Sequence, residues 1–243
     1  MGGSEGRWVV AAEPVEIKIN VAGAVDAAID VLSLDDGEAR DIYFAEDTTP
    51  GLASSHPLLA AGVVLRLRRE ADGTGDTTAK LRPCRRSQLM ARWSADTKDD
   101  DDQWVYRIEG DLTGSRRVLA ASLVQDLSAT ELAAGLDDPA HAFGRQTSFL
   151  DDCAAVRVNL AALTILGPVR ATKWSKIKVG SVKKVNAERW RVGSLDFLEL
   201  SRRVDADEAA AALAELTLAV LKAGLMLDTS SASKTEQVLD ALA

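Results

Sequence analysis

The segment GVVLRLRRE, residues 62–70, alternates apolar and basic side chains. In an extended chain, one face of this segment carries valine and leucine, and the opposite face carries Arg66 and Arg68. A period of two residues is typical of a half-buried β-strand, so we predict a strand here. The two arginines on its polar face suit an anion, because guanidinium groups donate to phosphate oxygens in pairs.

Six other segments show the same alternation and are predicted as strands. They are VEIKINV (15–21), TTAKLRP (77–83), QWVYRIEGD (103–111), VRATKWSKIKV (169–179), AERWRVG (187–193) and SLDFLELSRRV (194–204). Charged residues recur on the polar faces of the seven segments. The basic ones are Lys18, Arg66, Arg68, Lys80, Arg82, Arg107 and Arg203, and Glu16, Glu109 and Glu199 lie among them.

A charged face is ordinary for a single strand with one side in water. The set has a different meaning if the strands close into a barrel. The charged faces would then line the interior, while the apolar faces pack against outer helices. Arginine and lysine in such a lumen would neutralise phosphate oxygens. The carboxylates would repel phosphate, but they can hold Mg²⁺ or Mn²⁺, which bridges phosphate oxygens.

Helices are predicted between and after the strands, at residues 22–33, 148–166, 207–223 and 231–243. Ser148 and Ser233 are the expected N-caps of the second and the last. The third is expected to be an outer-wall helix packed on the sheet, and not a groove for a partner. Loops are predicted at residues 45–57, 71–77 and 94–102. Strands in both halves with helices between them indicate one α+β domain over residues 13–243, after an N-terminal tail at residues 1–12.

Charge and composition limit the partners. The formal net charge is −8, from 29 basic and 37 acidic residues. Such an excess of acid repels a nucleic-acid backbone, so we predict no nucleic-acid partner, although a local basic cavity is compatible with it. Two cysteines, Cys84 and Cys153, indicate a reducing compartment. The sequence has no run of about 18 apolar residues and no signal-peptide pattern, so we expect a cytoplasmic protein with no membrane partner.

Read in order, the segments resemble the motifs of CYTH-domain proteins, a group of triphosphate tunnel metalloenzymes. VEIKIN (15–20) is similar to the second half of the family's E-x-E-x-K strand, with Glu16 and Lys18 in register. GVVLRLRRE matches the family's G-x-x-L-R-x-R pattern through Arg66 and Arg68. Of all the matched segments, only LRLR (65–68) and the later Ser-Lys pair at 233–234 are close to literal, and the resemblance depends on the order of the segments.

Further segments follow in the order that the family shows. They are IYFAEDT (42–48) for its Tyr-Phe-Asp-Thr segment, TTAKLRP for its lysine strand through Lys80, and RIEGD for its R-x-E-x-E strand through Arg107, Glu109 and Asp111. Later come VRATKW with Arg170 and Lys173, DFLELS with Glu199, and SASKTEQVL with Ser233 and Lys234. The resemblance spans roughly residues 13–239.

The resemblance implies an eight-stranded antiparallel β-barrel, or tunnel, with flanking helices that binds triphosphate compounds with Mg²⁺ or Mn²⁺. Known members are inorganic triphosphatases, thiamine triphosphatases and one class of adenylate cyclases. It implies Glu16 and Lys18 as catalytic residues, and Glu16, Glu109 and Glu199 as metal ligands. It also implies phosphate contacts from Arg66, Arg68, Lys80, Arg107, Lys173, Arg203 and Lys234.

Two positions depart from the family pattern. Pro14 stands where the first glutamate of E-x-E-x-K is expected, and Glu13 is one residue out of phase, which puts it on the opposite face of a strand. Ser201 replaces the second acid of the family's E-x-E strand. Hard divalent cations need charged oxygen ligands, so these changes weaken a metal site more than an anion site.

Two functions follow from this pattern. The first is a metal-dependent phosphohydrolase that acts on inorganic triphosphate or an organic triphosphate. The second is a non-catalytic protein that binds triphosphate or polyphosphate in the same tunnel, which the changes at Pro14 and Ser201 favour. An adenylate cyclase is a weaker third hypothesis, since no residue indicates a pocket for a nucleotide base. We rank the hydrolase first because most of the expected tunnel charges are present.

Overall fold

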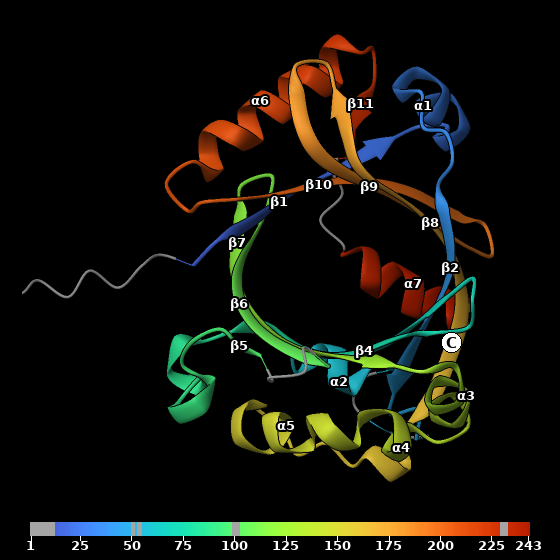
Figure 1. The fold of residues 1–243 in the computed structure, drawn as a ribbon, viewed down its shortest axis with the longest axis vertical. Helices are drawn as coiled ribbons and strands as arrows, with labels where there is room; N and C mark the ends of the chain where they lie inside the picture. Colours follow the sequence, from blue (N-terminus) through green and yellow to red (C-terminus); the bar gives the residue numbers. More distant parts are fainter. Residues whose placement is uncertain (1–12, 50–51, 53–54, 99–102, 229–232) are drawn as a thin grey trace, which may run out of the picture.

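A ring of nine β-strands forms the centre of the molecule (Figure 1). The computed structural model describes residues 13–49, 52, 55–98, 103–228 and 233–243, so the expected tail at residues 1–12 lies outside the described residues. The ring order is β1-β10-β9-β8-β2-β3-β4-β7-β6, and β6 returns to pair with β1. Two short strands, β5 and β11, lie outside the ring, on β6 and β1 respectively.

The bounds of the elements are as follows. The strands are β1 (Val15–Ala22), β2 (Glu38–Glu46), β3 (Val63–Glu70), β4 (Gly75–Cys84), β5 (Thr97–Lys98), β6 (Trp104–Thr113), β7 (Arg116–Leu127), β8 (Thr164–Val179), β9 (Val182–Val192), β10 (Leu195–Val204) and β11 (Met226–Leu227). The helices are α1 (Val25–Leu32), α2 (Pro57–Ala60), α3 (Ala129–Asp137), α4 (Pro139–Phe143), α5 (Thr147–Cys153), α6 (Ala209–Lys222) and α7 (Lys234–Leu242).

The barrel closes through a parallel pair, β1 with β6. Val15 lies opposite Gly110 at the start of this seam, where the Gly110 N–H donates to the Pro14 carbonyl at 2.8 Å. The other neighbours in the ring are antiparallel. The α+β barrel is confirmed, and the expected eight antiparallel strands are corrected to nine strands in a mixed barrel.

Part of the difference between the expected and the observed number of strands comes from β7, because the sequence of this strand does not alternate. RRVLAASLVQDL is apolar over most of its length, and Ala120 and Ala121 are neighbours that are both fully buried. A strand covered on both faces reads as a continuous apolar run, which the period of two does not detect. The strand β2 was not predicted, because the family resemblance marks the overlapping segment IYFAEDT (42–48) without assigning a strand to it.

The apolar faces of the alternating strands point outward and pack against helices. Leu65 and Leu67 of β3 belong to a core that reaches α3, α4 and α5. The rings of Tyr106 and Phe149 meet there at 5.4 Å, in the edge-on geometry that aromatic pairs favour. A second core joins β1, β9 and β10 to α6. The charged faces therefore point into the barrel, as the alternation predicts.

The prediction of a helix over residues 148–166 is wrong beyond Cys153, where α5 ends. Its N-cap is Gln146 and not Ser148. Residues from Thr164 onward belong to β8 and pair with the end of β2. A short apolar run fits a buried strand as well as a helix, and here the pairing with β2 decides.

The other three predicted helices are present as α1, α6 and α7. The hydroxyl of Ser233 caps α7 by accepting the Glu236 N–H at 3.1 Å, as predicted. The predicted loops are shorter than expected, since β2 extends to Glu46, β4 begins at Gly75 and β5 lies within 94–102. Within the described ranges, no helix has the length and apolar character needed to cross a membrane.

We expect the Gly110→Val variant to lower the free energy of unfolding by about 1–3 kcal/mol, because overpacking strains a closely packed site. A Cβ atom at Gly110 would lie 3.1 Å from Cγ2 of Val15, so a branched side chain would separate β1 from β6 at the seam. Urea unfolding measures the change. Thr113→Val is the control, because Thr113 lies on the same seam but lines the cavity, and a change within about 0.5 kcal/mol is expected. Equal stability of both variants would contradict this role for the seam.

Candidate anion-binding tunnel

The barrel encloses a cavity of about 930 Å³. Ten basic and five acidic side chains line it, and two further carboxylates, Asp76 and Asp111, pair with lining cations, which leaves an excess of three positive charges in a chain whose net charge is −8. The basic residues are Lys18, Arg66, Arg68, Lys80, Arg82, Arg107, Arg116, Lys173, Arg203 and Lys234, and the acidic ones are Glu16, Glu109, Glu188, Glu199 and Asp228. A low-dielectric wall with one excess sign of charge concentrates ions of the opposite sign, so this cavity attracts anions.

Each residue that the sequence assigns to the site lines this cavity. Arg170, which the resemblance offered beside Lys173, does not. It lies three positions earlier in β8, on the opposite face of the strand, and forms an ion pair with Asp41 outside the barrel. Glu13 is likewise elsewhere, paired with Arg86 at 2.8 Å, so it does not replace the glutamate missing at Pro14. Ser201 does line the cavity, but without a charge.

Three carboxylates gather on β1 and β6 in what we call the carboxylate cluster: Glu16, Glu109 and Asp111. Their oxygen atoms lie within 4.8 Å of one another. They come together because β1 and β6 run parallel, with Glu16 directly opposite Asp111 in the pairing. On β6, Glu109 and Asp111 are two residues apart and so share a face.

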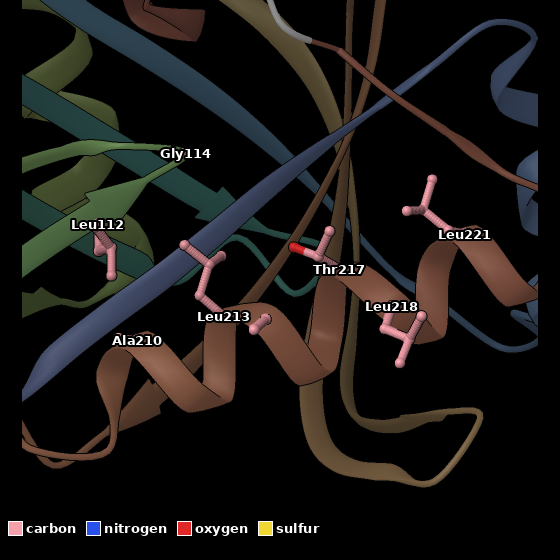
Figure 2. A pocket seen from close by; sticks show the side chains of 8 residues that line it. Leu112, Gly114, Ala210, Leu213, Thr217, Leu218 and Leu221 are labelled. Carbon is pink, nitrogen blue, oxygen red and sulfur yellow. The ribbon is translucent and has the colours of Figure 1, made fainter.

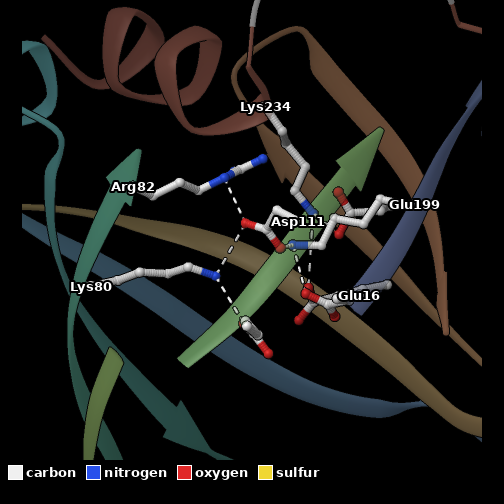
Figure 3. A network of polar contacts seen from close by, with 9 residues as sticks. Glu16, Lys80, Arg82, Asp111, Glu199 and Lys234 are labelled. Carbon is white, nitrogen blue, oxygen red and sulfur yellow. Dashed lines mark hydrogen bonds and ion pairs between the residues drawn. The ribbon is translucent and has the colours of Figure 1, made fainter. Parts of the chain in front are cut away.

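Three cations surround this cluster (Figure 3). Lys18 Nζ lies 2.7 Å from Glu16 and 3.2 Å from Asp111. Lys80 Nζ lies 3.2 Å from Glu109 and 3.4 Å from Asp111, and Arg82 Nε lies 2.6 Å from Asp111. The Asp111 side chain has no exposed surface, and all three cations reach it.

These contacts shift the pKa values in opposite directions. Burial alone would raise the pKa of Asp111, but Lys18, Lys80 and Arg82 outweigh it and lower this pKa from 3.8 to about 2. Burial alone would lower the pKa of Lys18, and the attraction of the surrounding carboxylates, Glu16 first, raises it well above its usual value instead. Both groups are therefore charged at neutral pH.

A second group lies where α7 meets β9 and β10. Lys234 Nζ is 3.2 Å from Glu199 and 3.8 Å from Glu188, and it lies 4.0 Å from the ring centre of Trp190. Burial tends to raise the pKa values of Glu188 and Glu199, but Lys234 contributes most to lowering both. The expected Ser-Lys element at the C-terminus therefore delivers a cation to the cavity wall.

The arginine pair of β3 forms a third group. Arg68 Nε pairs with Asp76 at 2.8 Å, whereas Arg66 reaches only the hydroxyl of Thr78, at 3.3 Å. Among the described residues, the buried Nε of Arg66 has no hydrogen-bond partner. Burial and, second, the repulsion of Arg68 lower the pKa of Arg66 to about 10. An anion beside Arg66 would satisfy the free donor and offset both effects.

Arg116 and Glu188 line the cavity although the sequence analysis did not name them, and Arg82, which it placed on the charged faces of the strands, was given no role in binding or catalysis. Arg82 and Glu188 do follow the period of two, as Lys80–Arg82 and Glu188–Trp190, so that signal was present. Arg116 begins the non-alternating strand β7, and nothing in its sequence context marks it. Asp111 was aligned with the last acid of the family's strand, but its place at the centre of three cations depends on barrel closure.

The carboxylate cluster fits the chemistry of Mg²⁺ or Mn²⁺, which prefer carboxylate oxygens. Glu199, expected as the third metal ligand, pairs instead with Lys234, and Asp111 joins Glu16 and Glu109 in its place. For a divalent ion to enter, Lys18 and Lys80 must turn away from these oxygens. Both are long, flexible side chains, so the donor set and a bound ion are compatible.

No family model matches the chain, and no curated protein matches it in sequence. Several solved structures share its fold. One of them is HpAC1 from Hippeastrum, proposed to be an adenylyl cyclase and described as having a dominant triphosphatase activity; it has 14% sequence identity and a TM-score of 0.57, over 93% of this chain and 94% of that one. Another is a protein from Bacillus halodurans, proposed to be an adenylate cyclase, with 12% identity and a TM-score of 0.59, over 93% and 97%. The chain therefore shares the fold of these two proteins, which is consistent with the expected CYTH-like barrel.

We expect Asp111→Asn to lower the free energy of unfolding at pH 7 by about 3 kcal/mol, because it removes the buried carboxylate that three partly buried cations share. A carboxylate with a lowered pKa stabilises the fold above its unfolded pKa, and this contribution is lost as the pH falls from about 4 to about 2. The difference between wild type and variant should shrink over that range. Denaturant titrations between pH 2 and 7 measure it.

Asp26→Asn serves as the control for this variant, because Asp26 pairs with Arg189 but is 83% exposed. Exposed ion pairs contribute about 1 kcal/mol or less, so this variant should remain close to wild type. An Asp111→Asn protein as stable as the Asp26→Asn protein would contradict the central role of Asp111.

Proposed function

We propose that the chain is a degenerate member of the CYTH-type triphosphate tunnel metalloenzymes, acting as a phosphohydrolase on inorganic triphosphate or an organic triphosphate. The observation that carries the proposal is Arg66, whose buried Nε has no hydrogen-bond partner among the described residues, in a cavity with an excess of positive charge. A group of phosphates is a ligand with matching charge and with acceptors for such donors. The fold shared with HpAC1, described as having a dominant triphosphatase activity, supports the same substrate class.

The proposed roles follow the three groups of the cavity. Arg66, Arg68 and Lys80 would neutralise phosphate oxygens along the β3–β4 wall, together with Arg107, Lys173 and Arg203 on the other strands. Lys18 and Lys234 would contact the terminal phosphate. The raised pKa keeps Lys18 protonated, so it can stabilise the charge that develops on phosphoryl oxygens.

Glu16, Glu109 and Asp111 would hold Mg²⁺ or Mn²⁺, with Glu199 nearby as a further carboxylate. A divalent ion there would supply Lewis-acid chemistry at the phosphoryl oxygens. Glu16 would orient a water in line with the terminal phosphorus and accept its proton. The water oxygen bonds to phosphorus while the bridging P–O bond breaks, which yields orthophosphate and the shortened phosphate chain.

We expect the purified protein to release phosphate from tripolyphosphate with Mg²⁺ or Mn²⁺, and Arg66→Ala to lower kcat/KM by about 10- to 150-fold. This range corresponds to losing a charge-assisted interaction of about 1.5–3 kcal/mol. Arg170→Ala is the matched control, because Arg170 points out of the barrel and should leave the rate unchanged. No phosphate release by the wild type with either metal would contradict the hydrolase.

The second candidate function is a binder of triphosphate or polyphosphate without catalysis. The position of the lysines favours it, because Lys18 and Lys80 already occupy the carboxylate oxygens that a metal needs. In that case the cations of the lining hold the anion by themselves. The changes at Pro14 and Ser201 point in the same direction, since each removes a carboxylate that the family pattern has.

For a binder, tripolyphosphate should raise the Tm in EDTA as much as in Mg²⁺, because a ligand that binds only the folded state stabilises it. At a concentration about 100 times its Kd, the stabilisation is about 2.7 kcal/mol. Thermal unfolding with tripolyphosphate, with orthophosphate as the control ligand, measures this. A Tm shift that disappears completely in EDTA would exclude metal-independent binding and favour the hydrolase.

A further inference from the structure

The helix α6 is apolar on two sides. One side, Ala209, Ala212, Leu216, Ala219 and Val220, is buried in the core against the barrel. A second stripe lies outside, made of Ala210, Leu213, Ala214, Thr217, Leu218 and Leu221. An outer helix normally turns a polar face to solvent, whereas α6 has only Glu215 and Lys222 as charged residues. Leu218 and Leu221 are 52% and 50% exposed.

This stripe forms one wall of an apolar groove of about 470 Å³ (Figure 2). The other wall is the end of the β6–β7 hairpin, at Leu112 and Gly114. In Figure 2, Leu213 lies at the hairpin end of α6 and Leu221 at the far end. The groove follows the helix from Ala210 to Leu221, about 16 Å at 1.5 Å per residue.

The groove adjoins the basic cavity. Gly114, Leu213 and Thr217 line both of them. The same hairpin carries Arg116, which lines the cavity two positions beyond Gly114. A ligand that follows this wall therefore passes from a strongly cationic surface to an apolar one.

We propose that the tunnel accepts the triphosphate ester of an apolar alcohol, with the phosphates in the basic cavity and the apolar group along α6. This inference rests on the proposed function and narrows its substrate class. Charge complementarity accounts for the phosphates, and the apolar stripe accounts for a group that would otherwise remain in water. Leu213 and Thr217 line both spaces, so a ligand with its phosphates in the cavity can place its ester group against α6.

The test compares the binding of octyl triphosphate and methyl triphosphate by calorimetry, in the presence of Mg²⁺. Each methylene that becomes fully buried strengthens binding about fourfold, so a chain lying partly in the groove should give at least about tenfold tighter binding than methyl. Leu218→Glu should reduce the ratio of the two Kd values, methyl triphosphate over octyl triphosphate, to about twofold or less. It should leave the Kd of methyl triphosphate unchanged. Val31→Glu on α1 is the matched control, with an exposed fraction of 51% against 52% for Leu218, and should keep the full ratio.

Equal affinity for the two esters in the wild type would overturn the inference and leave the proposed function intact. Failure of both esters and of inorganic tripolyphosphate to bind would instead overturn the proposed function itself. Sedimentation velocity on the same proteins tests a second copy as the occupant. A wild-type dimer that Leu218→Glu converts to a monomer, without any preference for the octyl ester, would assign the groove to a dimer interface and overturn the inference.

Discussion

The buried carboxylate of Asp111 is the point on which the barrel interior depends. It lies on β6 opposite β1, where the ring closes, and accepts contacts from Lys18 of β1 and from Lys80 and Arg82 of β4. An isolated carboxylate with no exposed surface would be costly, and three mutually repelling cations would be costly as well. Together they offset each other, and they tie β1, β4 and β6 across the lumen.

The period of two residues made this interior predictable in part. It separates apolar from charged faces correctly on β1, β3, β4, β6 and β10, because each of these strands has one face toward the cavity and one face buried in a hydrophobic core. It fails on β7, which is covered on both faces around Ala120 and Ala121. It also fails at residues 164–166, where an apolar run looks helical until β2 is available as a pairing partner. The ion pair between Asp111 and Arg82 depends on closure of the barrel, and the ion pair between Lys234 and Glu188 depends on the docking of α7. No local sequence pattern encodes either of them.

The choice between hydrolase and binder depends on whether a metal ion or the ammonium groups of two lysines occupy the oxygens of the carboxylate cluster. The oxygens of Glu16, Glu109 and Asp111 have the composition of a divalent-metal site, and the ammonium groups of Lys18 and Lys80 compete for the same oxygens. A metal ion that displaces the lysines would free them to contact phosphate, so metal and anion would bind cooperatively. With Lys18, Lys80 and Arg82 in place, the cluster is neutralised, and the remaining arginines carry the anion affinity.

The cation excess has a consequence for stability as well as for binding. Arg66, with its buried Nε and beside Arg68, has its pKa lowered to about 10, which means that the folded protein holds this charge less favourably than water does. Such a site stores unfavourable free energy that a suitable anion releases on binding. A barrel selected only for stability would pair or replace Arg66, as it pairs Arg68 with Asp76. Among the described residues no group accepts a hydrogen bond from the buried Nε of Arg66, and a ligand explains this free donor better than the fold does.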